Sequence, residues 1–181
     1  MWKKGFLVLL LLFGACSSAG AQRTDISGLK VDSTPATNLQ DLVRRCDMIV
    51  FGWTDSAHQS YPTRERVPEG RKVNYVQSIH VKTALKGTAP RLVDLLSTGV
   101  EPLPDPENPL NMTFPGPLAE GDYLLFLQPV KGTSLHSIVG LWQGVYPVYE
   151  GKTIALRNAG FSELNDITVS QVQQKLKSLS P

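Results

Sequence analysis

The stretch VNYVQSIHVKTAL, residues 73–85, decides the fold class of this 181-residue chain. Apolar side chains occupy alternate positions along it, at Val73, Tyr75, Ile79, Val81 and Leu85. The intervening positions are mostly polar or small. A period of two over such a length predicts a long β-strand with one buried face.

Shorter runs on either side of this stretch predict the other strands. We expect them at residues 47–53, 91–96, 121–127, 137–142, 145–149 and 153–156, with a hairpin loop at 150–152. Residues 55–72 are polar, and residues 99–117 hold six of the 13 prolines. Because proline cannot donate a ladder hydrogen bond, we expect both segments to be long loops.

A helix is predicted near each end of the domain. Residues 37–40 carry the Thr-x-x-Gln pattern of a capping box, which predicts a short helix beginning at Thr37. Near the C-terminus, apolar residues recur at helical spacing at Val169, Val172, Leu176 and Leu179. A second capping box begins at Thr168, and Ile167 can act as a hydrophobic staple. The domain is therefore expected to be mainly antiparallel β with a helix near each end.

The N-terminus has the pattern of an export signal. Lys3 and Lys4 precede a short uncharged apolar run, and Leu12-Phe13-Gly14-Ala15-Cys16 resembles the lipobox of bacterial lipoproteins. We therefore expect residues 1–15 to be a lipoprotein signal peptide and Cys16 to be lipidated. The alternative is cleavage after Ala21, which would release a soluble secreted or periplasmic protein.

The remaining chain divides into a tether and one domain. Residues 16–36 are rich in Ser, Thr, Ala and Gly and are expected to be a flexible tether, and residues 37–181 a single domain. Loss of Lys3 and Lys4 leaves 16 of the 18 basic residues against 16 acidic ones. This balance gives no electrostatic reason to expect nucleic acid binding, so membrane contact is expected through the lipid anchor only.

Three fragments carry a family resemblance: residues 47–52 (DMIVFG), 83–87 (TALKG) and 121–127 (GDYLLFL). Together they resemble uncharacterised bacterial secreted proteins and lipoproteins, and distantly the OB-fold barrel of netrin-type domains and tissue inhibitors of metalloproteases. The resemblance implies an OB-like antiparallel barrel over about residues 38–157. The inhibitors act through an N-terminal Cys-x-Cys pair, which this chain lacks beside its domain, so inhibition is not carried over.

No residue pattern for catalysis or metal binding is present. His58, His80 and His136 are scattered, and no H-E-x-x-H motif occurs. With Cys16 lipidated or removed, Cys46 stands alone and is expected to be a small buried hydrophobe. We therefore expect no enzyme activity, no metal and no cofactor.

The loops at 55–72 and 99–117 are the expected binding segments. We expect a non-catalytic binding or assembly module of the bacterial cell envelope, whose partner is an envelope protein or a cell-wall polymer. Apolar side chains of the second loop supply the expected contact: Leu103, Leu110, Met112 and Phe114. One alternative is that these side chains merely close an end of the barrel, and another is that the protein is a secreted hydrolase with an unrecognised site.

Overall fold

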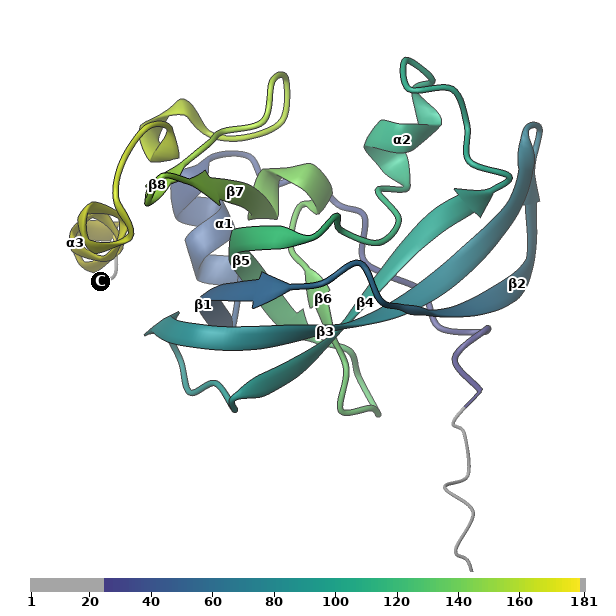
Figure 1. The fold of residues 1–181 in the computed structure, drawn as a ribbon, viewed down its shortest axis with the longest axis horizontal. Helices are drawn as coiled ribbons and strands as arrows, with labels where there is room; N and C mark the ends of the chain where they lie inside the picture. Colours follow the sequence, from purple (N-terminus) through teal and green to yellow (C-terminus); the bar gives the residue numbers. More distant parts are fainter. Residues whose placement is uncertain (1–24, 180–181) are drawn as a thin grey trace, which may run out of the picture.

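The computed structural model describes residues 25–179, which form a β-barrel flanked by helices (Figure 1). The helices are α1 (Leu39–Arg45), α2 (Leu110–Thr113) and α3 (Val169–Leu179), with 3-10 turns η1 (Leu141–Gly144) and η2 (Ser162–Leu164). The strands are β1 (Met48–Thr54), β2 (Gln59–Val67), β3 (Gly70–Lys86), β4 (Leu92–Glu101), β5 (Gly121–Pro129), β6 (His136–Ile138), β7 (Val145–Tyr149) and β8 (Lys152–Thr153).

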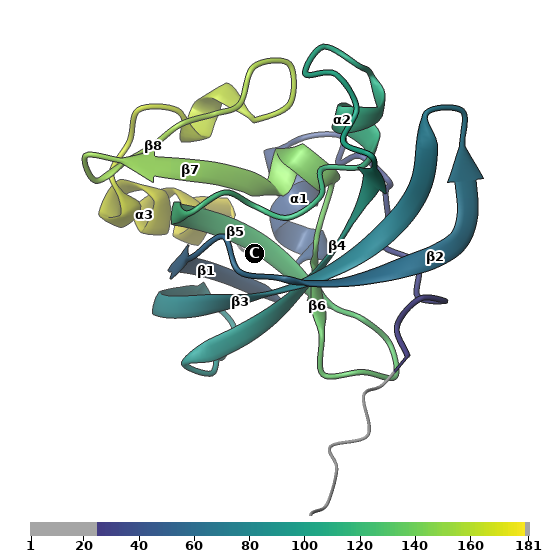
Figure 2. The same cartoon turned by 45° about the vertical axis from the view of Figure 1, so that its right-hand side comes forward.

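Five of these strands close the barrel, in the order β1-β3-β4-β6-β5 and back to β1 (Figures 1 and 2). This is the strand order of an OB-like barrel. The barrel is mixed and not wholly antiparallel as expected, because β4 and β6 run parallel, with Leu95 opposite His136. The hairpin from β5 to β6 inserts β6 beside β4, so these two strands point the same way.

The three fragments behind the family resemblance meet where the barrel closes. Phe51 of β1 lies opposite Thr83 of β3 on one side and Leu124 of β5 on the other. The Lys86 ammonium donates to the Val43 and Cys46 carbonyls at 2.7 and 2.6 Å, which satisfies the C-terminal end of α1. These fragments therefore hold the fold together.

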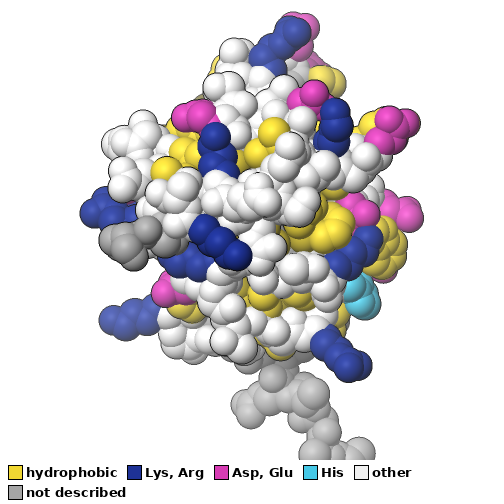
Figure 3. Space-filling model, turned by 90° about the vertical axis from the view of Figure 1, so that its left-hand side faces the viewer, with side chains coloured by type: hydrophobic (Ala, Val, Ile, Leu, Met, Phe, Trp, Pro, Cys, Tyr) yellow, Lys and Arg dark blue, Asp and Glu magenta, His cyan; other side chains and the backbone are white. Residues whose placement is uncertain are grey.

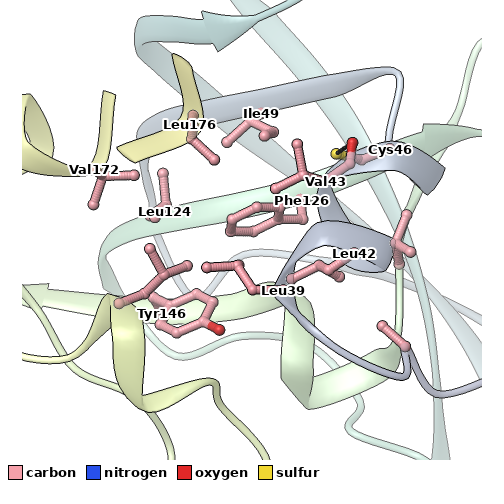
Figure 4. Close-up of a cluster of buried hydrophobic side chains, with 13 residues drawn as sticks. Leu39, Leu42, Val43, Cys46, Ile49, Leu124, Phe126, Tyr146, Val172 and Leu176 are labelled. Atoms are coloured by element: carbon pink, nitrogen blue, oxygen red, sulfur yellow. Dashed lines mark hydrogen bonds between the residues drawn. The ribbon is translucent and has the colours of Figure 1, made fainter. Parts of the chain in front are cut away.

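Strand β5 is apolar on both faces because it serves two cores. Leu125 belongs to the cluster inside the barrel, together with Val50 and Ile79. Leu124 and Phe126 point outward into a second cluster, where α1 and α3 cover the barrel (Figure 4). Alternate side chains of one strand thus fill both sides, as the sequence indicated.

Helix α3 begins and packs as predicted. The Thr168 N–H donates to Gln171 Oε1 at 2.8 Å, and the Gln171 N–H donates back to Thr168 Oγ1 at 3.3 Å, so the capping box is confirmed. Val172 and Leu176 are 0% and 4% exposed and lie in the outer cluster (Figure 4). The amphipathic helix is therefore held by its predicted face.

Helix α1 is present, but it begins one residue later than predicted. Asn38, not Thr37, is its N-cap, and the Asn38 side chain accepts from the Asp41 N–H at 2.8 Å. Asp41 in turn accepts from the Thr37 N–H at 3.1 Å. Asn is at least as good an N-cap as Thr, and an acidic side chain is favourable in the first turn, so the Asn38–Asp41 pair forms the cap.

Several predicted elements differ in the structure. The loop expected at 99–117 begins with the end of β4 and contains helix α2. Residues 59–67, expected within a loop, form β2, which pairs only with β3 and tolerates Pro62 because it lies at the sheet edge. The strand expected at 137–142 ends at Ile138, since Gly140 turns the chain with a φ of 69°. The strand expected at 153–156 is reduced to the two residues of β8.

The described part of the expected tether packs on the barrel. Ile26 and Ala36 are 4% and 5% exposed, so residues 25–36 are not a free linker. We call residues 25–33 the strap. Its apolar side chains, Leu29 and Val31 among them, join Leu96 of β4 in a third cluster, which offsets the entropy of ordering the segment. The expected signal peptide and Cys16 lie outside the described residues.

The helices are short, and within residues 25–179 no helix is long and apolar enough to cross a membrane. On the side of the molecule opposite the β2–β3 hairpin, basic and acidic side chains are interspersed with small patches of apolar surface (Figure 3).

Candidate functional site

A cavity of about 560 Å³ lies between the strap and the outer surface of the barrel. We call it the strap cavity. We call residues 99–117 the proline-rich loop. The other walls of the cavity include residues 63–65 of β2, Lys72 and Asn74 of β3, residues 96–98 of β4 and residues 113–115 of the proline-rich loop. The cavity therefore joins the two segments that the sequence singled out, 55–72 and 99–117.

The cavity occupies the face on which OB barrels commonly hold ligands. Strands β3 and β4 are the second and third strands of the barrel along the chain. Asn74 lies opposite Thr98, and Val76 lies opposite Leu96, on the side of this strand pair that faces the strap. In OB folds this face and the neighbouring loops bind oligonucleotides and oligosaccharides.

Asn74 fixes the strap to this face. The side chain is 1% exposed, and its amide donates to the backbone carbonyls of Ile26 at 2.8 Å and Leu29 at 3.0 Å. Its carbonyl oxygen accepts from the Thr98 hydroxyl at 2.7 Å. A buried amide needs such partners, since an unsatisfied buried polar group costs about 1–3 kcal/mol.

An ion-pair network of Lys30, Glu65 and Lys72 lies at the cavity. The Glu65 carboxylate accepts from Lys72 at 2.8 Å and lies 3.4 Å from the Lys30 ammonium. These two partners, Lys72 foremost, hold the pKa of Glu65 below its usual value. Lys72 also stands 4.5 Å from the centroid of the Phe114 ring, a cation–π contact between β3 and the proline-rich loop.

Of the four apolar side chains expected to contact a partner, the structure places one in the cavity. Phe114 lines it and is half-buried. Leu110 is half-buried elsewhere in the loop, whereas Met112 and Leu103 are 46% and 86% exposed. None of the four is fully buried, whereas Leu118, further along the chain, is a buried member of the inner cluster.

The proline-rich loop is held in place by backbone contacts. The Trp142 indole donates to the Asn111 carbonyl at 2.7 Å, and the Gly116 N–H donates to the Thr98 carbonyl at 3.0 Å. Phe114 lies between these two attachments along the chain and is thereby held at the cavity. The exposed tip, with Leu103, lies outside them.

The three histidines contact different residues and do not form a cluster. His58 contacts the Ser56 carbonyl at 2.9 Å and packs edge-on against Tyr75, and His80 packs near Trp53. His136 buries its Nδ1 without a hydrogen-bond partner among the described residues, and burial lowers its pKa. Within residues 25–179, no group of three or more His, Cys, Asp or Glu is placed to hold a metal ion.

Cys46 is buried, as predicted. It is 2% exposed, its thiol donates to the Val43 carbonyl at 3.2 Å, and burial raises its pKa to about 11. A thiol with such a pKa is protonated and unreactive at neutral pH, so Cys46 serves the core.

The sequence did not single out the strap, Lys72 or Asn74. The available signal was Ile26, Leu29 and Val31, an apolar spacing inside a polar segment. Comparisons of the chain with protein-family models, with curated proteins and with solved structures found no match.

Proposed function

We propose that this protein is a non-catalytic binding or assembly module of the bacterial cell envelope, anchored through a lipid on Cys16, and that it holds its partner at the strap cavity. The partner is an envelope protein or a cell-wall polymer. One observation carries the proposal. Two segments far apart in the sequence, 63–65 and 113–115, line one cavity on the ligand-binding face of an OB-like barrel.

The size and lining of the cavity suit a binding role. Its volume of about 560 Å³ falls within the range of ligand pockets, roughly 300–1,000 Å³. The lining includes the apolar residues Leu29, Leu96 and Phe114 and the polar residues Thr63 and Thr98. A partner seated there can extend over the exposed Leu103 and Met112 of the same loop.

The family resemblance is part of this proposal. Its three fragments are residues of strands and turns, so they support the OB-like fold of netrin-type domains and of secreted bacterial lipoproteins. Strand and turn residues indicate the fold but not the activity, because one fold can host many functions.

Lipid anchoring would keep the cavity near the membrane. If Cys16 is the mature N-terminus, only residues 16–24 separate the lipid from the strap, and about nine residues reach at most roughly 30 Å. This reach is shorter than that of a tether extending to residue 36. The proposed partner therefore lies close to the membrane surface.

Site-specific photo-cross-linking in whole cells tests the proposal. A photoreactive amino acid is placed at Thr63 or Thr113 on the cavity wall, or at the exposed Gln173 of α3 as a control. We expect discrete adducts, of protein or glycan, from the two cavity positions and not from Gln173. Adducts from Gln173 alone, or equal yields from all three positions, would contradict the proposal.

A further inference from the structure

We infer that the strap cavity is part of a polypeptide-binding groove that the strap occupies in cis, and that the partner supplies a polypeptide turn with an apolar residue at each end, which replaces the strap. This inference rests on the proposed function and narrows the partner to a polypeptide. It follows from how the strap itself is held.

The groove recognises backbone through a fixed side chain. Asn74 donates to the carbonyls of Ile26 and Leu29, and the Thr98 hydroxyl holds the Asn74 carbonyl oxygen from the neighbouring strand. Two carbonyls three residues apart are available in any polypeptide turn. The amide carbonyls of a polysaccharide belong to N-acetyl groups on separate sugar rings, so they do not form the pair of backbone carbonyls that a turn presents.

Apolar contacts on either side of the turn would determine which peptide sequences the groove binds. The Leu29 N–H donates to the Ile26 carbonyl at 3.1 Å, so Ser27 and Gly28 form the turn between them. Ile26 is 4% exposed and packs with Leu96, while Leu29 packs at the edge of the same cluster. The segment recognised is thus an apolar residue, two turn residues and a second apolar residue.

The charged contact of the strap lies at the surface. The inner side of the strap faces the cavity, and its ion pair from Lys30 to Glu65 joins side chains that are 84% and 47% exposed. Such exposed pairs contribute little to stability. The chain that follows the strap has a separate attachment, because Arg45 of α1 donates to the Thr34 and Pro35 carbonyls at 3.0 and 3.1 Å.

Arg45 therefore defines where displacement of the strap would stop. The Arg45 guanidinium also pairs with Asp32 at 3.2 Å, so residues 25–31 can leave the groove while residues 32–36 stay on α1. Occupation in cis lowers the apparent affinity for a partner, since only the open fraction of molecules can bind. Release of residues 25–31 would also lengthen the membrane tether.

The first test uses the mature chain made soluble by Cys16→Ser. Ile26→Asp with Leu29→Asp is introduced to expel the strap, and a fluorescent peptide of residues 25–33 is the probe. We expect the double variant to bind the peptide at least about ten-fold more tightly than the unsubstituted chain does. Adding Asn74→Ala to the double variant should remove the gain in affinity. A control peptide with Asp in place of Ile26 and Leu29 should not bind.

Folding of the double variant is checked by circular dichroism. A folded double variant that binds the two peptides equally would overturn the inference. Peptide binding without adducts at Thr63 or Thr113 would contradict the proposed function and leave the groove standing. Glycan adducts without peptide binding would overturn the polypeptide groove and leave the proposed function standing.

Amide hydrogen exchange on the unsubstituted chain gives a second test that needs no variant to fold. The Leu29 N–H should exchange through local opening, faster than the paired amides of β3 and β4. If the Leu29 amide exchanges only as slowly as global unfolding, the strap is a fixed part of the domain and the inference fails.

Discussion

Gly99 of β4 and Gly116 of the proline-rich loop pack backbone against backbone: a Cβ atom built on Gly99 would lie 2.9 Å from the Cα atom of Gly116. The same Cβ would lie 2.8 Å from the ring of Tyr75, a buried side chain of β3. This close approach, with the Gly116–Thr98 hydrogen bond, positions the loop so that Phe114 reaches the cavity.

Gly99→Ala is therefore expected to destabilise the domain. Overpacking of a tight backbone contact typically costs about 1–3 kcal/mol. The measurement is the denaturant midpoint of unfolding. Gly28→Ala is the matched control, because a Cβ there meets no atom within 4 Å. Equal midpoints in the two variants would mean that the loop does not pack closely on β4.

Much of the fold follows from periodicity along single segments. The alternation in residues 73–85 predicted β3, the run at 121–127 predicted β5, and the spacing of Val172 and Leu176 predicted the packed face of α3. The edge strand β2 was missed because most of its side chains are polar and none is fully buried, so the segment carries no hydrophobic period. The parallel β4–β6 pair depends on a partner distant in sequence, which periodicity cannot reveal.

The site was only partly predictable for a related reason. Loop length and proline content pointed to the 99–117 segment, and Phe114 does line the cavity. In the sequence Asn74 looks like an ordinary outward residue of the half-buried strand, and Lys72 looks like the end of a polar loop. Only the strap and the proline-rich loop show their place in the cavity. The strap itself is polar in composition, so a few apolar side chains did not distinguish it from a tether.

Truncation of the α3 contacts should weaken the domain. Val172→Ala and Leu176→Ala remove side chains that are 0% and 4% exposed, and each is expected to cost about 2–4 kcal/mol of unfolding free energy, measured by chemical denaturation. Gln173→Ala, on the exposed face of the same helix, should leave the midpoint nearly unchanged. An unchanged midpoint in both core variants would refute the packing.

Stability is expected to fall as the pH drops below the ordinary histidine pKa. Burial lowers the pKa of His136 from 6.5, so the folded state keeps this ring neutral while the unfolded chain takes up a proton. The contribution of His136 is thus complete above about pH 6.5 and is lost as the pH falls toward its lowered folded pKa. His136→Leu should show a smaller loss of stability between about pH 7 and pH 5 than the unsubstituted chain. Gln173→Ala, which alters an exposed side chain without an ionisable group, is the control and should leave the pH dependence unchanged.

Lipidation is expected at Cys16, which lies outside the described residues. Metabolic labelling with a fatty-acid probe in a bacterial host should tag the unsubstituted chain and fail to tag Cys16→Ser. An unlabelled mature protein that begins at Gln22 would show cleavage at the alternative site and a soluble product. The strap would then start only a few residues from the N-terminus.

The proline-rich loop, and no histidine, is expected to carry partner capture. Replacing residues 103–110 with a short Gly/Ser linker removes the exposed Leu103 together with Leu110. The attachments of Asn111 to Trp142 and of Gly116 to Thr98 lie beyond the replaced segment, so the barrel should stay folded. The yield of adduct from a cross-linker at Thr63 should nevertheless fall sharply.

Two further variants separate the loop from the histidines. Phe114→Ala removes the one aromatic ring of this loop that lines the cavity and should lower the adduct yield from Thr63 while the denaturant midpoint changes little. Replacing His58, His80 and His136 together by Gln should leave the yield intact, because their rings do not line the cavity. The two results together would indicate that the partner binds at the cavity surface and not at a histidine. Unfolding of the loop replacement, or loss of the adduct in the triple histidine variant, would instead mean that the loop is structural or that a histidine acts at the site.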